Sequence, residues 1–199
     1  MPNFIDTPEI EKKTELNYKG NILFCGRLTK AKGTILLIKA FEKIKNKKIN
    51  LLIAGDGSEK DNLIRYVSEN NINNIEFLGH LKKNELDETY QSALFLVIPS
   101  ISIENYPFVA TEALSNSIPV VAFDSGGLRE IVVNNKTGFL VDRVNIEELT
   151  NKMNFLIENP EIARKMGENG LMSVKKLNRE DYYKKLIEIY SKTINNVRN

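Results

Sequence analysis

The sequence predicts an α/β fold in which helices cover both faces of a doubly wound parallel sheet. Three apolar runs, at residues 21–25, 94–98 and 120–123, show no alternation with polar residues. Such runs are typical of strands buried on both faces. Segments with apolar residues at helical spacing separate the runs, and a polar loop follows each run. Strands that alternate with helices favour a parallel sheet with right-handed crossovers.

The elements can be assigned in chain order. The first strand, 21–25, leads to a helix after residue 34, and strands at 50–54 and 75–78 are followed by helices at about 59–68 and 84–92. A central βαβ unit comprises the strand at 94–98, a helix that starts near residue 105 and the strand at 120–123. A short helix through residue 131, a short strand at 139–141 and helices at about 146–158, 160–172 and 179–196 follow.

Length and composition favour a single α/β domain. The chain has 199 residues, of which 42% are hydrophobic and 27% charged, enough for one sizeable core. Residues 1–20 are polar and lack periodicity, so we assign them to a linker. The domain is expected over residues 21–178, followed by a C-terminal segment at 179–199.

Charge and cysteine content exclude several classes of function. The net charge of +2 and the even spread of lysines do not suggest nucleic acid binding. The single cysteine, Cys25, cannot form an internal disulfide and is expected to be a small buried core residue. The sequence contains no signal peptide pattern, lipidation motif or apolar run of membrane-spanning length, which favours a cytoplasmic location.

The start of the central helix is a candidate anion site. Asn105 is expected to cap this helix, and Pro107 fits its first turn because no N–H is needed there. The free amides of residues 106–109 would then face the carboxyl edge of the sheet. Unpaired amides and the positive end of the helix dipole attract anions, phosphate above all.

Two carboxylates flank this helix start. Glu104 precedes the helix and Glu112 lies within it, roughly 10 Å away along the axis at a rise of ~1.5 Å per residue. Ionised carboxylates accept hydrogen bonds and suit the hydroxyls of a ribose or hexose. An anion site between two hydroxyl acceptors describes a sugar nucleotide; the alternative is that both side chains are simply solvated at the surface.

Two cations follow the first strand. Arg27, next to Gly26, could bind a diphosphate with a bidentate fork, and Lys32 could add a mobile point charge. Two basic residues in an exposed loop could equally be solvated. The loops after parallel strands meet at one edge, so we expect these cations to lie near the helix start.

Other patterns give weaker signals. Gly55-Asp56-Gly57 lacks the third glycine of a dinucleotide-binding loop, and Lys32-Gly33-Thr34 reverses the order of a phosphate-binding P-loop. His80, the only histidine, is a poor candidate for a general base. No spacing of Cys, His or Asp indicates a metal site, so no metal is predicted.

Several motifs, taken together, resemble the donor-binding half of group 1 glycosyltransferases. These are retaining enzymes with two Rossmann-like domains, the B-type fold, so the resemblance implies a Rossmann-like doubly wound parallel sheet that forms one half of such an enzyme. Glu104 and Glu112, separated by seven residues, match the paired-glutamate signature of the family. The motifs occur in the family's order: residues 24–41, 52–57, 77–81, Pro99-Ser100, Glu104 to Ala113, 119–122, 126–131 and 138–141.

The resemblance also implies roles for individual residues. Arg27 and Lys32, helped by amides near Phe108 and Val109, would hold the donor diphosphate, Glu104 would contact the transferred sugar and Glu112 the ribose. Arg27, Lys32 and Glu104 are the candidate catalytic residues. The donor would be a UDP-, GDP- or ADP-linked sugar, bound as a substrate without cofactor or metal. The wider donor-binding set adds Gly26, Tyr106 and Pro107, with Gly79, His80 and Leu81 beside the base.

The family's amino-terminal, acceptor-binding domain has no counterpart in this sequence. Pro2 to Asp6 resembles the segment that ends that domain, so residues 1–20 would be a remnant of the interdomain linker. The acceptor domain would be supplied in cis or in trans, and this chain alone would transfer poorly or not at all. A peripheral contact with the inner face of a membrane would come through that absent half.

Three further questions follow from the resemblance. Asn105 stands where the family usually has a small residue, which leaves the sugar preference open. The last helix carries an apolar stripe that could pack on the absent domain or on this domain's own sheet: Tyr183, Leu186, Ile187, Tyr190 and Ile194. The alternative functions are a stand-alone nucleotide-sugar-binding partner of a split transferase and, with less support, a sugar-nucleotide epimerase or a phosphorylase.

Overall fold

The computed structural model describes residues 20–175 and 179–197. It contains a six-stranded, fully parallel sheet with the order β3-β2-β1-β4-β5-β6. The fold class predicted from the sequence is therefore confirmed. The strands are β1 (Asn21–Cys25), β2 (Asn50–Ala54), β3 (Ile75–Gly79), β4 (Ala93–Ile98), β5 (Val120–Phe123) and β6 (Gly138–Val141).

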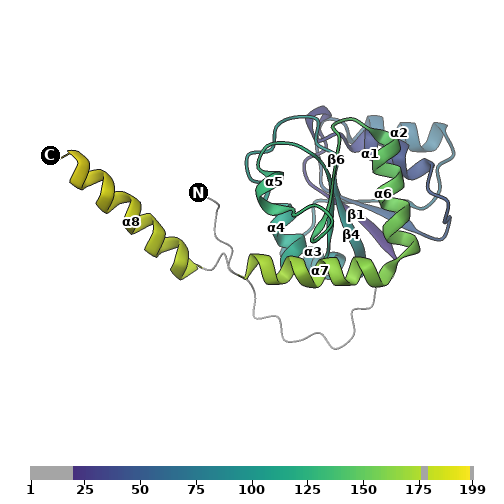
Figure 1. Ribbon diagram of the computed structural model, residues 1–199. Helices are drawn as coiled ribbons and strands as arrows, with labels where there is room; N and C mark the ends of the chain where they lie inside the picture. Colours follow the sequence, from purple (N-terminus) through teal and green to yellow (C-terminus); the bar gives the residue numbers. More distant parts are fainter. Residues whose placement is uncertain (1–19, 176–178, 198–199) are drawn as a thin grey trace.

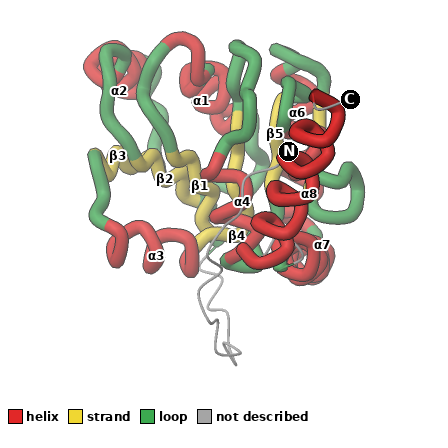
Figure 2. The backbone as a smooth tube through the Cα atoms, turned by 90° about the vertical axis from the view of Figure 1, so that its left-hand side faces the viewer, coloured by secondary structure: helices red, strands yellow, loops and turns green. Residues whose placement is uncertain are grey.

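The helices cover both faces of this sheet (Figures 1 and 2). One face carries α1 (Thr34–Glu42), α2 (Lys60–Glu69) and α6 (Ile146–Glu158), and the other carries α3 (Lys83–Ser92), α4 (Phe108–Ser115) and the short α5 (Leu128–Ile131). A 3-10 turn, η1 (Lys30–Lys32), precedes α1. Helix α7 (Pro160–Val174) runs below the sheet in Figure 1 and packs on both α4 and α6.

Burial on both faces explains why the strands read as continuous apolar runs. In β4, Phe95 and Val97 belong to the core under α1, α2 and α6, whereas Leu96 and Ile98 belong to the core under α3, α4 and α5. All six residues of β4 are buried. A strand with two buried faces has no polar side, so its sequence loses the alternation of a half-exposed strand.

The strand order reverses between β1 and β4, which are neighbours at the centre of the sheet. From β1 the chain proceeds outward through β2 to β3, and from β4 it proceeds in the other direction to β6. The loops after β1 and β4 therefore diverge at the carboxyl edge of the sheet. Open α/β sheets bind their ligands at such a switch point.

The C-terminal helix α8 (Arg179–Val197) is drawn in yellow in Figure 1, away from the sheet and its covering helices. Three residues of its predicted apolar stripe, Tyr183, Ile187 and Tyr190, are exposed. The side chain of Ile194 and most of the predicted linker lie outside the described residues. Packing of α8 on an acceptor domain stays a prediction. Among the described residues, no helix combines the length and apolarity needed to cross a membrane.

Candidate functional site

A cavity of about 310 Å³ lies at the carboxyl edge, where the loops after β1, β2 and β3 meet. It brings together four residues that the sequence places in the donor site: Gly26, Arg27, His80 and Leu81. Strands β1 and β3 lie on either side of β2, so the sheet order brings the loops that follow these three strands to one cavity. The remaining lining residues are Cys25, Ala54, Gly55, Asp56 and Leu86.

The loops after β1 and β2 touch because Gly55 has no side chain. A Cβ atom at this position would lie 1.9 Å from the carbonyl oxygen of Gly26, and the φ angle of +140° is itself unfavourable for other residues. The amide of Leu28 donates to the carbonyl of Asp56 at 2.8 Å, which joins the two loops. The glycine loop that looked like an incomplete dinucleotide motif therefore has a packing role.

Asp56 is a lining residue that the sequence analysis did not identify. Its carboxylate accepts hydrogen bonds from Lys60 and from the amide of Gly57, each at 2.7 Å. These two bonds, that of Lys60 first, hold the pKa of Asp56 below its usual value. Its position in the loop that follows the buried strand β2 was the available signal.

Helix α4 begins later than the sequence analysis predicts. Phe108 is its first residue and Pro107 is the N-cap residue, so the prediction that Asn105 caps the helix is wrong. The cause is Pro107, because the residue before a proline is driven away from helical geometry. The first amides, those of Phe108 and Val109, have no acceptor among the described residues, and the amide of Ala110 bonds back to Pro107. These two are the amides to which the family resemblance assigned the diphosphate.

Glu104 is a buried carboxylate, not a solvated surface residue. It is 8% exposed and its Oε1 atom lies 2.6 Å from Nζ of Lys32. The hydroxyl of Ser100 donates to the same oxygen, which leaves Oε2 without a partner among the described residues. The two residues predicted to bind the diphosphate and the sugar therefore lie in direct contact.

The loop after β5 holds the Glu104 segment in place. The amide of Gly127 donates to the carbonyl of Glu104 at 2.6 Å, and the amide of Glu104 donates to the hydroxyl of Ser125 at 3.4 Å. A Cβ atom on Gly127 would lie 1.8 Å from the carbonyl oxygen of Asn105. Gly127 belongs to the 126–131 motif of the family resemblance, and the structure shows that its lack of a side chain lets the two loops approach.

The other predicted site residues lie on or just before α4 and at the end of β3. Glu112 is half-buried and accepts a hydrogen bond from the hydroxyl of Tyr90 at 3.1 Å. The hydroxyl of Tyr106 is buried without a partner among the described residues, and its side chain packs against the core under α3, α4 and α5. Phe108 is 54% exposed. Gly79 lies at the end of β3, next to the cavity-lining His80.

Cys25 packs against the core under α3, α4 and α5, but it is only half-buried and also lines the cavity, so the prediction of a small buried core residue holds in part. It is the last residue of β1, where the strand leaves the core. Burial, followed by the nearby charge of Glu112, raises its pKa from 9.0 to about 11.

This raised pKa predicts slow alkylation of Cys25. Because the thiolate is the nucleophile, a shift from 9.0 to about 11 leaves about 100-fold less thiolate at pH 8. We expect iodoacetamide to label the folded protein about 100-fold more slowly than the urea-unfolded protein, as measured by mass spectrometry. Between pH 7.5 and 9.5 the folded rate should rise about tenfold per pH unit, whereas the unfolded rate should level off near pH 9. A folded rate that also levels off near pH 9 would contradict this prediction.

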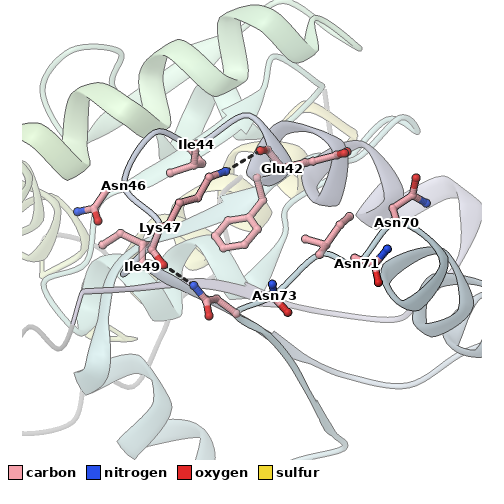
Figure 3. A pocket seen from close by; sticks show the side chains of 11 residues that line it. Glu42, Ile44, Asn46, Lys47, Ile49, Asn70, Asn71 and Asn73 are labelled. Carbon is pink, nitrogen blue, oxygen red and sulfur yellow. Dashed lines mark hydrogen bonds between the residues drawn. The ribbon is translucent and has the colours of Figure 1, made fainter.

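A second cavity, of about 630 Å³, lies between the loops that precede β2 and β3, at the opposite edge (Figure 3). Its apolar wall includes Ile44 and Ile49, and its rim carries asparagines and Lys47. Local bonds use several of these polar groups: Lys47 donates to the carbonyl of Glu42 and Asn70 to that of Tyr66. None of the predicted site residues lines this cavity.

Among residues 20–175 and 179–197, no group of three His, Cys, Asp or Glu side chains is placed to hold a metal ion.

The sheet order and the cavity beside its switch point define a Rossmann-like α/β domain. The chain belongs to the group 1 glycosyltransferase family, whose sequence model matches residues 6–172. An uncharacterised glycosyltransferase of Methanocaldococcus jannaschii is 37% identical over 158 residues, which cover 79% of this chain and 44% of that protein. A second glycosyltransferase, of Haemophilus influenzae, is 34% identical, with 84% of this chain and 46% of the relative covered. The chain thus spans less than half the length of these relatives.

Solved structures share the fold. HepE of Anabaena, crystallised with UDP, superposes with a TM-score of 0.81 at 22% identity, over 89% of this chain and 50% of HepE. The C-terminal domain of a group 1 family protein, LpcC of Francisella tularensis, superposes with a TM-score of 0.77 at 23% identity. The matched region covers 86% of this chain and 97% of that domain. At these identities the likeness concerns the fold alone.

Proposed function

We propose that this domain binds the nucleoside diphosphate part of a nucleotide sugar and serves retaining glycosyl transfer. One observation carries the proposal: three kinds of group lie at the same edge of the sheet. They are the cavity that Arg27 lines, the two free amides at the start of α4, and the carboxylates of Glu104 and Glu112. The curated relatives are named as glycosyltransferases, and HepE was solved with UDP, which supports a nucleoside diphosphate as the ligand.

Arg27, Lys32 and the amides of Phe108 and Val109 bind the diphosphate in this proposal. Transfer breaks the bond between the sugar and the diphosphate, so negative charge develops on the leaving group. Cationic side chains and a helix start fixed beside that charge lower the barrier, and no metal is required for this.

Glu104 accepts a hydrogen bond from the transferred sugar through Oε2. Its other oxygen is already engaged by Lys32 and Ser100, and a carboxylate held in this way suits recognition better than nucleophilic attack. Retention then follows a route in which the acceptor approaches the face that the diphosphate leaves. Because the chain spans 44% of its relative, we assign the acceptor site to a further domain in cis or in trans, without which transfer is inefficient.

Titration calorimetry with UDP, GDP and ADP tests the proposal. We expect one of them to bind, and Arg27→Ala to weaken it by about tenfold or more, because a hydrogen bond to a charged group contributes about 1.5–3 kcal/mol. The control is Arg65→Ala, an exposed arginine on α2, which should leave the affinity unchanged.

Two results would contradict the proposal. One is a folded protein that binds none of the three nucleotides, or that binds one equally well after Arg27→Ala. The other is sustained epimerisation of a nucleotide sugar by the protein in the absence of any acceptor.

A further inference from the structure

The hydroxyl of Tyr90 links the buried side of α3 to the candidate site. Tyr90 is 1% exposed, and its hydroxyl donates a hydrogen bond to Oε2 of Glu112 at 3.1 Å. A tyrosine hydroxyl can donate one hydrogen only, and a buried one needs a partner. The partner here is Glu112, the carboxylate to which the family resemblance assigns the ribose of the bound nucleotide.

The same hydroxyl interacts with the thiol of Cys25 at the end of β1. Burial, followed by the proximity of Cys25 and Glu112, holds the pKa of Tyr90 far above its usual value, so the hydroxyl stays protonated at any working pH. Cys25 lines the cavity that also contains Arg27 and Leu81. Tyr90 therefore connects a wall of the cavity to Glu112.

Resting on the proposed function, we infer that Tyr90 positions Glu112 to accept a hydrogen bond from the ribose of the bound nucleotide. Since the Tyr90 hydrogen occupies Oε2, the other carboxylate oxygen remains for a ribose hydroxyl. A glutamate that is already fixed by one hydrogen bond loses less side-chain freedom when the ligand binds, and this preorganisation raises affinity. Tyr90 is a positioning residue, because it acts through Glu112 and does not itself touch the ribose.

The test compares UDP with 2′,3′-dideoxy-UDP, which lacks both ribose hydroxyls. We expect the wild-type protein to prefer UDP by about tenfold or more, since the hydroxyls bond to a charged group. Tyr90→Phe keeps the ring and removes only the hydroxyl. It should weaken UDP binding about fivefold, which corresponds to the entropic cost of immobilising roughly one side chain on binding. The affinity for dideoxy-UDP should stay unchanged. Tyr66→Phe, on the helix α2 of the opposite face, is the matched control and should change neither affinity.

A merely structural role for Tyr90 would weaken both ligands equally, and that result would overturn the inference. A second measurement uses Glu112→Ala. This variant should lose the preference for the ribose hydroxyls, and adding Tyr90→Phe to it should change nothing further. Retention of the full preference by Glu112→Ala would also overturn the inference.

If the wild-type protein binds neither UDP nor GDP nor ADP, the proposed function fails and the inference fails with it. If binding is intact but Tyr90→Phe retains the full wild-type preference for UDP over dideoxy-UDP, only the inference fails.

Discussion

Replacing Gly127 with alanine is expected to lower the free energy of unfolding by about 3 kcal/mol, because the new methyl group has no space. Its carbon would lie 1.8 Å from the carbonyl oxygen of Asn105 and 2.7 Å from the carbonyl carbon, so backbone atoms would have to move. The φ angle of Gly127 is −67°, which alanine adopts readily. The whole effect is therefore steric, and urea denaturation followed by circular dichroism measures it.

The control is Gly79→Ala, which separates steric from backbone effects. A Cβ atom at Gly79 meets no atom within 4 Å, but its φ angle of +68° disfavours alanine by about 1 kcal/mol. If Gly127→Ala proves no less stable than Gly79→Ala, the loop after β5 does not hold the segment of Glu104 as we describe. In that case the position of Glu104 needs another explanation.

Replacing Lys32 with methionine is expected to lower the free energy of unfolding by about 2 kcal/mol, because Glu104 is then left buried with only one strong partner. The exposed fraction is 10% for the side chain of Glu104 and 26% for that of Lys32. The exposure of Lys32 places the expected loss below that of a fully buried pair. Adding Glu104→Gln removes the unpaired charge, so the double variant should regain at least half of the loss.

Lys30→Met provides the control for this prediction. Lys30 belongs to the same 3-10 turn as Lys32 and is exposed, so its replacement should change the stability by less than about 0.5 kcal/mol. Equal stabilities of Lys30→Met and Lys32→Met, or a double variant less stable than Lys32→Met alone, would show that the ion pair does not stabilise the fold.

Much of the fold could be predicted because buried parallel strands leave a clear trace in the sequence. The runs 21–25 and 50–54 were predicted with the bounds that β1 and β2 have in the structure. Element ends were less certain where local signals compete. Before α4, Asn105 is a residue type that commonly caps helices. However, Pro107 disfavours helical geometry at Tyr106, so the helix begins only at Phe108.

The candidate site was predicted in part, and the reason lies in the range of the interactions. Arg27, His80 and Leu81 could be assigned to one edge because each follows a strand. The contact between Lys32 and Glu104 could not be predicted, since it joins residues 72 positions apart and depends on the side-chain conformations. A role for Tyr90 in the site was also not predicted, because an aromatic residue in a helical pattern is usually part of the core.

The sequence by itself determined the parallel α/β fold, the family and the residue types available for an anion and for hydroxyl groups. These follow from local patterns: apolar runs, helical spacing and motifs within single loops. Only the tertiary structure decided which oxygen of Glu104 is engaged, what holds Glu112 and why Gly55 and Gly127 lack a side chain. Those features arise where segments distant in the chain meet, and atomic distances at such contacts are fixed by packing and not by local sequence.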